Sequence, residues 1–214
     1  MPRAALTRER ILQAGIRLAD TGGSGSITMR KLGRALGVEA MSLYNHVANK
    51  DDLLDGMIDL VFGEIDLSPA GADWEERMRA SAVSAHDAFL RHPWACGLIL
   101  DPGTPRVIPA RARYMESILG RLRDARFSAE LTYHGYHALD SHILGFTLWE
   151  IGHALPPGDP AELFAGFQRL FPVSEFPHLA EHVRQHMTDG SHRDVGAFEF
   201  GLGLILDGLK RMRG

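Results

Sequence analysis

Two short amphipathic segments on either side of a glycine limit the fold of this chain more than any other feature. In residues 28–36 the apolar side chains fall on one side of a helix, and the arginines and the lysine fall on the other. Gly37 follows at the point where a helix end favours a left-handed residue. In residues 38–46, Val38 and Leu43 can face inward. The sequence therefore predicts two short helices joined by a tight turn.

Such a pair of helices is either a helix-turn-helix or an ordinary αα-hairpin. Small residues at the start of the second helix would let its backbone approach a groove, where Tyr44 and His46 can hydrogen-bond to phosphates or base edges. A helix-turn-helix reads the major groove of DNA in this way. In an unrelated αα-hairpin, Tyr44 and His46 would instead be half-buried packing residues. The pattern alone leaves both interpretations open.

Charge is divided unevenly along the chain. Residues 1–50 carry eight Lys and Arg against three Asp and Glu, a net charge of +5. The whole chain of 214 residues has a net charge of −4, so the remaining 164 residues carry −9. A basic head on an acidic body favours a phosphate-binding module. A solvated basic face is the alternative that charge alone does not exclude.

Composition places the chain among ordinary globular proteins, with 45% hydrophobic and 23% charged residues. The single cysteine, Cys96, excludes an intrachain disulfide and favours a reducing compartment. We interpret it as a small buried apolar group. Neither a signal peptide nor a run of roughly 20 apolar residues is visible, so we expect a cytoplasmic protein.

Helical periodicity recurs along the whole chain, which predicts an all-α protein. The expected helices cover residues 7–20, 28–36, 38–46, 53–62, 74–90, 111–122, 128–154, 161–170, a segment after Pro177, and 195–212. Residues 67–71 interrupt the pattern and mark a soft boundary. We therefore expect an N-terminal domain of residues 1–66 and a C-terminal helical bundle of residues 67–214. Residues 94–109 suggest short turns over a pocket more than regular structure.

The head resembles the DNA-binding domain of the tetracycline-repressor (TetR) family of bacterial regulators. The resemblance covers about the first 65 residues and is most specific in a Leu-Tyr-x-His-Val-x-x-Lys-x-x-Leu-Leu run. That run consists here of Leu43, Tyr44, His46, Val47, Lys50, Leu53 and Leu54. It implies a three-helix helix-turn-helix domain, with helix four as the connection to a body that binds a ligand and dimerises.

The resemblance also implies which residues contact operator DNA. They are Thr28, Arg30, Ala40, Met41, Ser42, Tyr44, Asn45, His46 and Lys50. Ala40 to Ser42 match the base-facing start of the recognition helix, and Lys50 matches a lysine that binds a phosphate. Asn45 stands where the tetracycline repressors carry a large aromatic residue, so the operator sequence need not be the same.

The helix expected at residues 128–154 carries polar side chains that suit a small-molecule pocket. His134, His137 and Ser141 lie at i, i+3 and i+7 and share one face. Exposed or satisfied core histidines are the alternative for each of them. The predicted effector contacts are His86, Phe89, Trp94, Met115, His134, His137, Ser141 and His142.

Tetracycline itself is not the expected effector. The tetracycline repressors hold a magnesium–drug chelate through a histidine before the seventh helix, and this chain has none between Pro93 and Tyr133. Glu150 does match a glutamate that acts on that metal through water in the family. We therefore expect a metal-free ligand of unknown identity and no cofactor.

Two further histidine patterns leave a competing function class open, a helical metalloprotein or enzyme. His178, His182 and His186 are spaced four apart, as metal ligands can be, but an amphipathic helix with exposed histidines explains them equally. Asp140, His137 and Ser141 could be drawn as a catalytic set. Three residues on one helix are poor geometry for a triad, and no nucleophile elbow surrounds Ser141.

The last expected helix, residues 195–212, contains four glycines that weaken an isolated helix by about 1 kcal/mol each. Close helix–helix approach would offset this cost, and the family resemblance implies a four-helix dimer interface here. The predicted interface residues are Phe146, Trp149, Phe198, Gly201, Leu202, Ile205, Leu206 and Leu209. The expected function is a homodimeric, ligand-responsive repressor that an effector releases from palindromic operator DNA.

Overall fold

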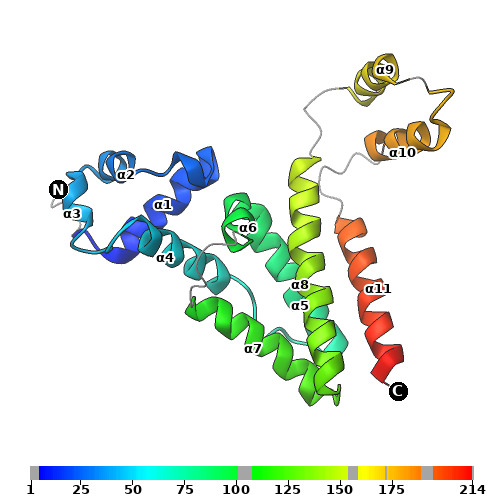
Figure 1. Cartoon of the computed structure of the whole chain (residues 1–214), viewed down its shortest axis with the longest axis horizontal. Coiled ribbons are helices and arrows are strands. Elements are labelled where there is room, and N and C mark those ends of the chain that lie inside the picture. The colour runs from blue at the N-terminus through cyan, green and yellow to red at the C-terminus, as the bar shows by residue number, and fades with distance from the viewer. Residues whose placement is uncertain (1–4, 101–107, 154–158, 172, 189–194, 214) are drawn as a thin grey trace.

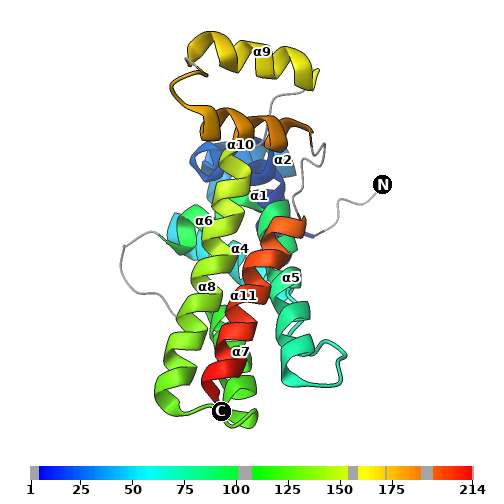
Figure 2. The ribbon, with the colours of Figure 1, turned by 90° about the vertical axis from the view of Figure 1, so that its right-hand side faces the viewer.

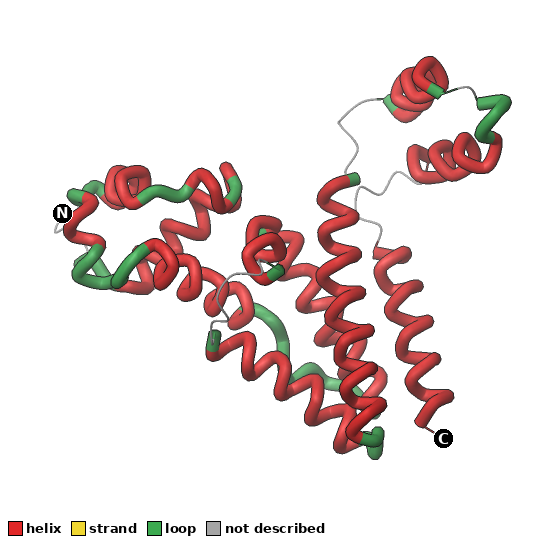
Figure 3. Tube along the Cα trace, in the orientation of Figure 1, coloured by secondary structure: helices red, strands yellow, loops and turns green. Residues whose placement is uncertain are grey.

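The computed structural model describes residues 5–100, 108–153, 159–171, 173–188 and 195–213, and in these ranges every regular element is a helix (Figure 3). The prediction of an all-α protein is confirmed. None of the described helices combines the length and the apolar character needed to cross a bilayer.

Four α-helices and one short 3-10 helix form the head, at the left of Figure 1. They are α1 (Arg8–Gly22), η1 (Ser24–Ser26), α2 (Met29–Leu36), α3 (Ala40–Leu43) and α4 (Lys50–Gly63). Their apolar faces meet in one core, with Ile11, Ile27, Leu32, Leu43, Val47 and Leu53 almost completely buried. The hydrophobic spacing in the sequence thus specifies which faces of these helices turn inward.

Three predicted helix ends of the head are confirmed: the start of α1 and both ends of α2. Thr7 caps α1 by accepting a hydrogen bond from the backbone N–H of Arg10 at 3.3 Å, and Thr28 caps α2 by accepting one from Lys31 at 3.1 Å. Gly37 ends α2 in the left-handed region, with φ 68° and ψ 34°. Each cap satisfies backbone groups that the helix end would otherwise leave without partners.

Two local predictions were wrong. The helix expected over residues 38–46 is only α3, Ala40–Leu43, because Glu39 is extended and the chain then closes through i→i−3 bonds at Tyr44 and His46. Residues 93–99, expected as turns, form a short helix, α6 (Pro93–Ile99). Proline at the first helical position favours a helix start, which outweighed the pattern of turn residues. The rest of the predicted turn segment, 101–107, lies outside the described residues.

The body is built around one long helix. Its helices are α5 (Trp74–Arg91), α6, α7 (Pro109–Asp124), α8 (Ala129–Gly152), α9 (Pro160–Leu170), α10 (Pro177–Thr188) and α11 (Val195–Arg213). Helix α8 contacts α5, α6, α7 and α11, and α9 and α10 contact each other beyond the end of α8 (Figures 1 and 2). The body therefore presents α8 and α11 side by side along one face.

Helix α4 belongs to both halves of the molecule. It packs against α1 in the head and against α5, α6 and α7 in the body. Gly15 and Gly56 permit the α1–α4 contact, because a Cβ at either position would lie within 3 Å of Met57 or Leu12 respectively. A displacement of the body can therefore reach the head through α4.

Candidate functional sites

The turn between α2 and α3 is held by a buried glycine. Gly33 lies in the middle of α2, and a Cβ built on it would be 2.8 Å from the Val38 carbonyl oxygen and 3.2 Å from the Ala40 nitrogen. The Gly33 carbonyl in turn accepts a hydrogen bond from Val38 N at 2.9 Å. Only a residue without a side chain lets the backbone of α3 cross α2 this closely, so Gly33 sets the angle between the two helices.

Helix α3 and the turn after it present the predicted recognition residues to solvent. Met41 is 74% exposed and Tyr44 44% exposed, and Asn45 is exposed beside them. Ala40, Ser42 and His46 are half-buried, whereas Thr28, Arg30 and Lys50 are exposed. Leu43 and Val47 supply the packing that holds α3 to the head. Tyr44 is therefore not the half-buried packing residue of an unrelated hairpin.

A bidentate ion pair holds the turn between α3 and α4. Arg8 donates to both oxygens of Asp52, at 2.6 and 2.9 Å, and to the His46 carbonyl at 3.1 Å. The hydrogen bonds from Arg8 are the main cause that lowers the pKa of the Asp52 carboxyl, which also accepts from Ala48 N at 2.8 Å. Asn49 caps α4 beside Lys50. This fixed turn leaves the Lys50 ammonium exposed at a helix N-terminus, where a phosphate is also favoured.

A second candidate site is the buried polar cluster of His86, Thr147 and Glu150 between α5 and α8. His86 Nδ1 lies 2.8 Å from Thr147 Oγ1, and His86 Nε2 lies 3.1 Å from Glu150 Oε2. The ring of His86 also stacks on Phe198 of α11, with centroids 4.0 Å apart. Three helices thus contribute to one buried group of polar atoms inside an aromatic wall.

The hydrogen bonds of Thr147 decide how His86 is oriented. Its hydroxyl donates to the Ile143 carbonyl at 2.6 Å, so its oxygen accepts the proton on His86 Nδ1. That arrangement leaves Nε2 as the ring atom facing the Glu150 carboxyl group. Burial lowers the pKa of His86 to about 4. With a neutral ring, Nε2 is a hydrogen-bond acceptor that faces Oε2 of Glu150, and these two atoms form the buried polar centre of the cluster.

The structure separates the eight predicted effector residues into two groups. His86 and His142 lie in the aromatic wall, where His142 Nε2 contacts the Phe198 carbonyl at 3.0 Å, and Met115 is half-buried in the body core. The others do not join them. Phe89 packs against Phe62 of α4, and the indole N–H of Trp94 donates to Asp20 of the head at 2.7 Å. The structure therefore places Trp94 at the contact with the head and away from His86.

His134, His137 and Ser141 share a face, as predicted, but this face is exposed in the single chain. The inward positions of α8 are occupied by Thr132, Tyr136, Leu139, Ile143 and Thr147. The predicted row lies one residue away from this stripe, which turns it about 100° around the helix. For this reason the three side chains do not join His86 in the single chain, and their role as effector contacts stays a prediction.

Sequence reasoning did not include Thr147, nor did it group Glu150 with His86. Thr147 looks like an ordinary helix residue, and nothing in the sequence pairs it with a histidine 61 positions away. Glu150 was noted only through its match to a family glutamate. The available signal was a pair of polar residues, Thr147 and Glu150, one turn apart on a mostly apolar stripe of the helix.

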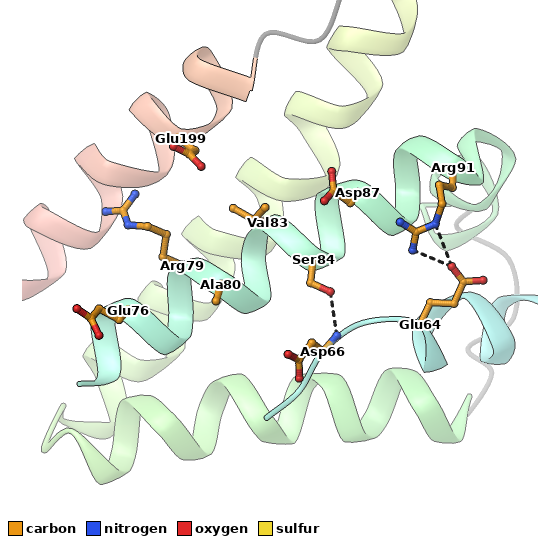
Figure 4. Close-up of a pocket in the computed structure, with 10 residues that line it drawn as sticks. All are labelled: Glu64, Asp66, Glu76, Arg79, Ala80, Val83, Ser84, Asp87, Arg91 and Glu199. Carbon is orange, nitrogen blue, oxygen red and sulfur yellow. Dashed lines mark hydrogen bonds and ion pairs between the residues drawn. The ribbon is translucent and has the colours of Figure 1, made fainter. Parts of the chain in front are cut away.

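A groove of about 720 Å³ runs along the outside of α5, but it is a different site (Figure 4). Its charged lining is acidic on balance. The lining residues are Glu64, Asp66, Glu76, Arg79, Ala80, Val83, Ser84, Asp87, Arg91 and Glu199. None of the predicted effector residues is among them.

Asp140 is a half-buried carboxyl group on α8, close to Tyr114, Tyr136 and Arg111. Burial is the main cause that raises the pKa of Asp140, although Arg111 and the two tyrosines partly oppose it. Because the pKa is higher in the folded than in the unfolded chain, the ionised carboxylate costs stability at neutral pH. That cost disappears as the pH falls from the folded pKa toward the unfolded value of about 3.9.

The variant Asp140→Asn, which cannot ionise, should therefore unfold at a higher temperature than the wild type at pH 8. The gain should shrink toward pH 4.5, and each 1 kcal/mol would appear as about 2–4 °C in a chain of this size. Thermal unfolding monitored by circular dichroism across this pH range measures both the gain at pH 8 and its decrease toward pH 4.5. A gain of equal size at every pH would contradict the assignment to Asp140.

On α11 the predicted dimer residues mostly face the chain itself. Phe198, Leu202, Leu206 and Leu209 are buried against the body of the same chain, and a Cβ on Gly201 would lie 2.5 Å from His142. These five residues therefore pack within their own chain, and their place in a dimer interface stays a prediction. The outward apolar residues of α11 are Phe200, Leu204 and Met212, exposed by 70%, 58% and 71%. Trp149 on α8 is exposed, whereas Phe146 on α8 and Ile205 on α11 are half-buried.

Of the three histidines of α10, only His178 and His182 have described side chains. No group of three His, Cys, Asp or Glu among the described side chains is placed to hold an ion. His178 and His182 are exposed on the helix surface, and the side chain of His186 lies outside the described residues.

Comparison with known proteins shows a match for each half of the chain. Residues 11–57 match the family described as bacterial regulatory proteins, tetR family, and residues 68–213 match the family described as the tetracyclin repressor-like C-terminal domain. An HTH-type transcriptional regulator of Saccharopolyspora erythraea is 40% identical over 94 residues, which are 44% of this chain and 40% of that protein. The repressor DrrR1 of Streptomyces coeruleorubidus is 26% identical over 221 residues, which cover 98% of this chain and 79% of that protein.

A solved structure resembles the chain over its whole length. ActR of Streptomyces coelicolor, in complex with actinorhodin, has a TM-score of 0.74 and is 27% identical. The similarity covers 99% of this chain and all of that chain. The head and the body are thus similar to parts of one and the same type of protein.

Proposed function

The chain belongs to the tetracycline-repressor (TetR) family of bacterial regulatory proteins, and from this premise we propose that it is a homodimeric repressor that a small molecule releases from operator DNA. Membership makes it a DNA-binding transcriptional regulator and not an enzyme, which removes the case for a helical metalloprotein or enzyme. We divide it into a DNA-binding domain of residues 1–66 and an effector and dimerisation domain of residues 67–214.

The observation that carries the DNA-binding role is the exposed surface of α3 beside the N-terminus of α4. Ala40, Met41 and Ser42, which lie on α3, and Asn45, which lies in the turn directly after it, would read base edges. Thr28, Arg30, Tyr44, His46 and Lys50 would hold the phosphate backbone on either side. Two such heads about 34–36 Å apart would read a palindrome.

Fluorescence anisotropy with DNA from the gene's own promoter region tests this role. The purified protein should prefer a palindromic segment of that region over random duplex DNA, and the affinity should fall as salt increases. Equal affinity for both duplexes at every salt concentration would show that the chain is not a specific operator-binding protein.

Lys50 and Asn45 should have different effects on this binding. Lys50→Ala should weaken binding to the palindrome and to random duplex by the same factor, and should reduce the salt slope by about 1 for each chain of the dimer, since each chain loses one phosphate contact. Asn45→Ala should change which operator variants are preferred and leave the salt slope unchanged. Competition titrations with single-base operator variants measure both effects. A Lys50→Ala loss confined to the palindrome would contradict a phosphate-binding role.

The effector site that we propose is the His86 cluster between α5 and α8. ActR, which resembles this chain over its whole length, forms a complex with actinorhodin, and this supports a small-molecule site in this chain. His86 and Glu150 would supply the polar contacts, and His142, Phe146 and Phe198 the aromatic wall. We propose a metal-free ligand, and its coupling to DNA must be reciprocal: each ligand weakens the binding of the other.

Homodimerisation would use the outer faces of α8 and α11. Trp149 and Leu148 of α8 and Phe200 and Leu204 of α11 are exposed apolar residues on these two helices, which lie side by side (Figure 2). Exposed apolar residues gathered on one face are typical of an interface. A second copy would cover them as a four-helix bundle.

A further inference from the structure

Three body side chains hold the head through carboxylates that lie far away in the sequence. At the corner between α5 and α6, His92 Nδ1 lies 2.8 Å and the indole nitrogen of Trp94 2.7 Å from the same oxygen, Oδ1 of Asp20 near the end of α1. The other ring nitrogen of His92 lies 3.1 Å from Glu64, directly after α4. One corner of the body thus contacts both head helices that reach it.

Arg91 completes this junction from the side of the acidic groove. Its guanidinium donates twice to Oε2 of Glu64, at 2.8 and 3.2 Å (Figure 4). His92 is almost completely buried, whereas the carboxylates of Asp20 and Glu64 remain partly exposed. Because the His92 ring is buried, it has little freedom to move, and it therefore fixes the positions of both carboxylates.

The same helix carries the proposed effector cluster. His86 lies six residues before His92 on α5, a separation of about 9 Å along the helix axis. Because a helix moves as a rigid element, a shift of α5 against α8 at His86 is transmitted to the corner at His92. This route reaches α1 directly through Asp20, in parallel with the covalent connection through α4.

We propose that His92 and Trp94 form a latch that positions the DNA-binding head by holding Asp20 of α1. With the latch closed, the head has a defined orientation on the body. Without it, the head remains attached through α4 but samples a wider range of orientations. The consequence for DNA binding rests on the proposed function, whereas the orientation of the head does not.

Spin-label distance measurements within one chain test the latch. Gln13 of α1 and Glu116 of α7 are exposed, and their replacement by cysteine places one label on the head and one on the body. Cys96 is completely buried, and burial raises the pKa of its thiol to about 11, so it should remain unlabelled. Diluting labelled protein with excess unlabelled protein leaves one labelled chain per dimer.

Asp20→Ala removes both latch contacts and should broaden the distance distribution, whereas Asp20→Asn keeps the Oδ1 acceptor and should retain the narrow distribution of the wild type. Trp94→Phe, which removes only the indole N–H, should broaden it partially. Glu9→Ala removes an exposed carboxylate from the other end of α1 and is the matched control. Its distribution should stay narrow.

DNA binding provides the second readout. Asp20→Ala should weaken operator binding about three- to tenfold with an unchanged salt slope, because no phosphate contact is lost. A distribution for Asp20→Ala as narrow as that of the wild type would overturn the latch, and so would one for Asp20→Asn as broad as that of Asp20→Ala. A narrow-to-broad change in a protein without operator preference would retain the latch and refute the proposed function instead.

Discussion

Replacing Gly33 with alanine should disable DNA binding although the residue touches no DNA. The added Cβ would meet the Val38 carbonyl oxygen at 2.8 Å and the Ala40 backbone at 3.2–3.3 Å. These are backbone atoms that move only if α3 moves. Overpacking of this kind costs about 1–3 kcal/mol, which exceeds the gain of up to about 1 kcal/mol from replacing a helical glycine.

Operator affinity should fall at least about tenfold in Gly33→Ala, since α3 must tilt away from α2 and its exposed residues lose their common orientation. Anisotropy titrations measure the operator affinity, and thermal unfolding measures the loss of stability. Gly120→Ala in α7 is the matched control, because nothing lies within 4 Å of a Cβ at that position. It should be neutral or slightly stabilising. Wild-type operator affinity in Gly33→Ala would show that the contact does not set the angle of the recognition helix.

Phe200→Glu should convert the proposed dimer into a monomer. Phe200 is 70% exposed in the single chain, so the substitution leaves the body core intact. In the dimer it would place an unpaired carboxylate from each chain in an apolar interface, and an unpaired buried charge costs about 3–5 kcal/mol. The dimer dissociation constant should therefore rise by a factor of about 100 or more. Light scattering coupled to size exclusion should show half the wild-type mass at micromolar concentrations.

The same variant should bind a full palindrome no more tightly than a single half-site, because each head then acts alone. Glu199→Gln, one residue earlier on α11, changes a side chain that faces the acidic groove beside Arg79 (Figure 4). This control should remain dimeric. A dimeric Phe200→Glu variant would place the interface on a different surface. By contrast, Leu202→Glu should unfold the body, because Leu202 is buried within its own chain.

Local rules of helix chemistry explain how much of the head was predictable. Thr7, Thr28 and Gly37 lie at helix ends, where a hydroxyl acceptor or a left-handed residue is needed within a few positions of the chain. Apolar spacing then identifies the buried faces. The family motif around Leu43 to Leu54 adds the direction in which α3 points, and the exposure of Met41, Tyr44 and Asn45 agrees with it.

The body was harder to predict because its helices are apolar on more than one face. Helix α11 has Phe198, Phe200, Leu202, Leu204 and Leu206 in close succession, and periodicity alone does not distinguish the stripe that packs inside the chain from the stripe left outside. On α8, a difference of one residue separates the exposed His137 and Ser141 from the inward Tyr136 and Asp140. Because each residue turns the helix by about 100°, an error of one position moves a predicted site residue to a different face of the helix.

By itself the sequence determined the all-α class and the caps of α1 and α2 in the head, because these depend on contacts between residues close in the chain. Only the tertiary structure decided that His86 meets Thr147 and Glu150, that Asp20 meets His92 and Trp94, and that Phe200 rather than Phe198 faces outward. These groups are brought together by helices up to 74 residues apart. Such contacts depend on how whole helices rotate and pack against one another, which no local pattern specifies.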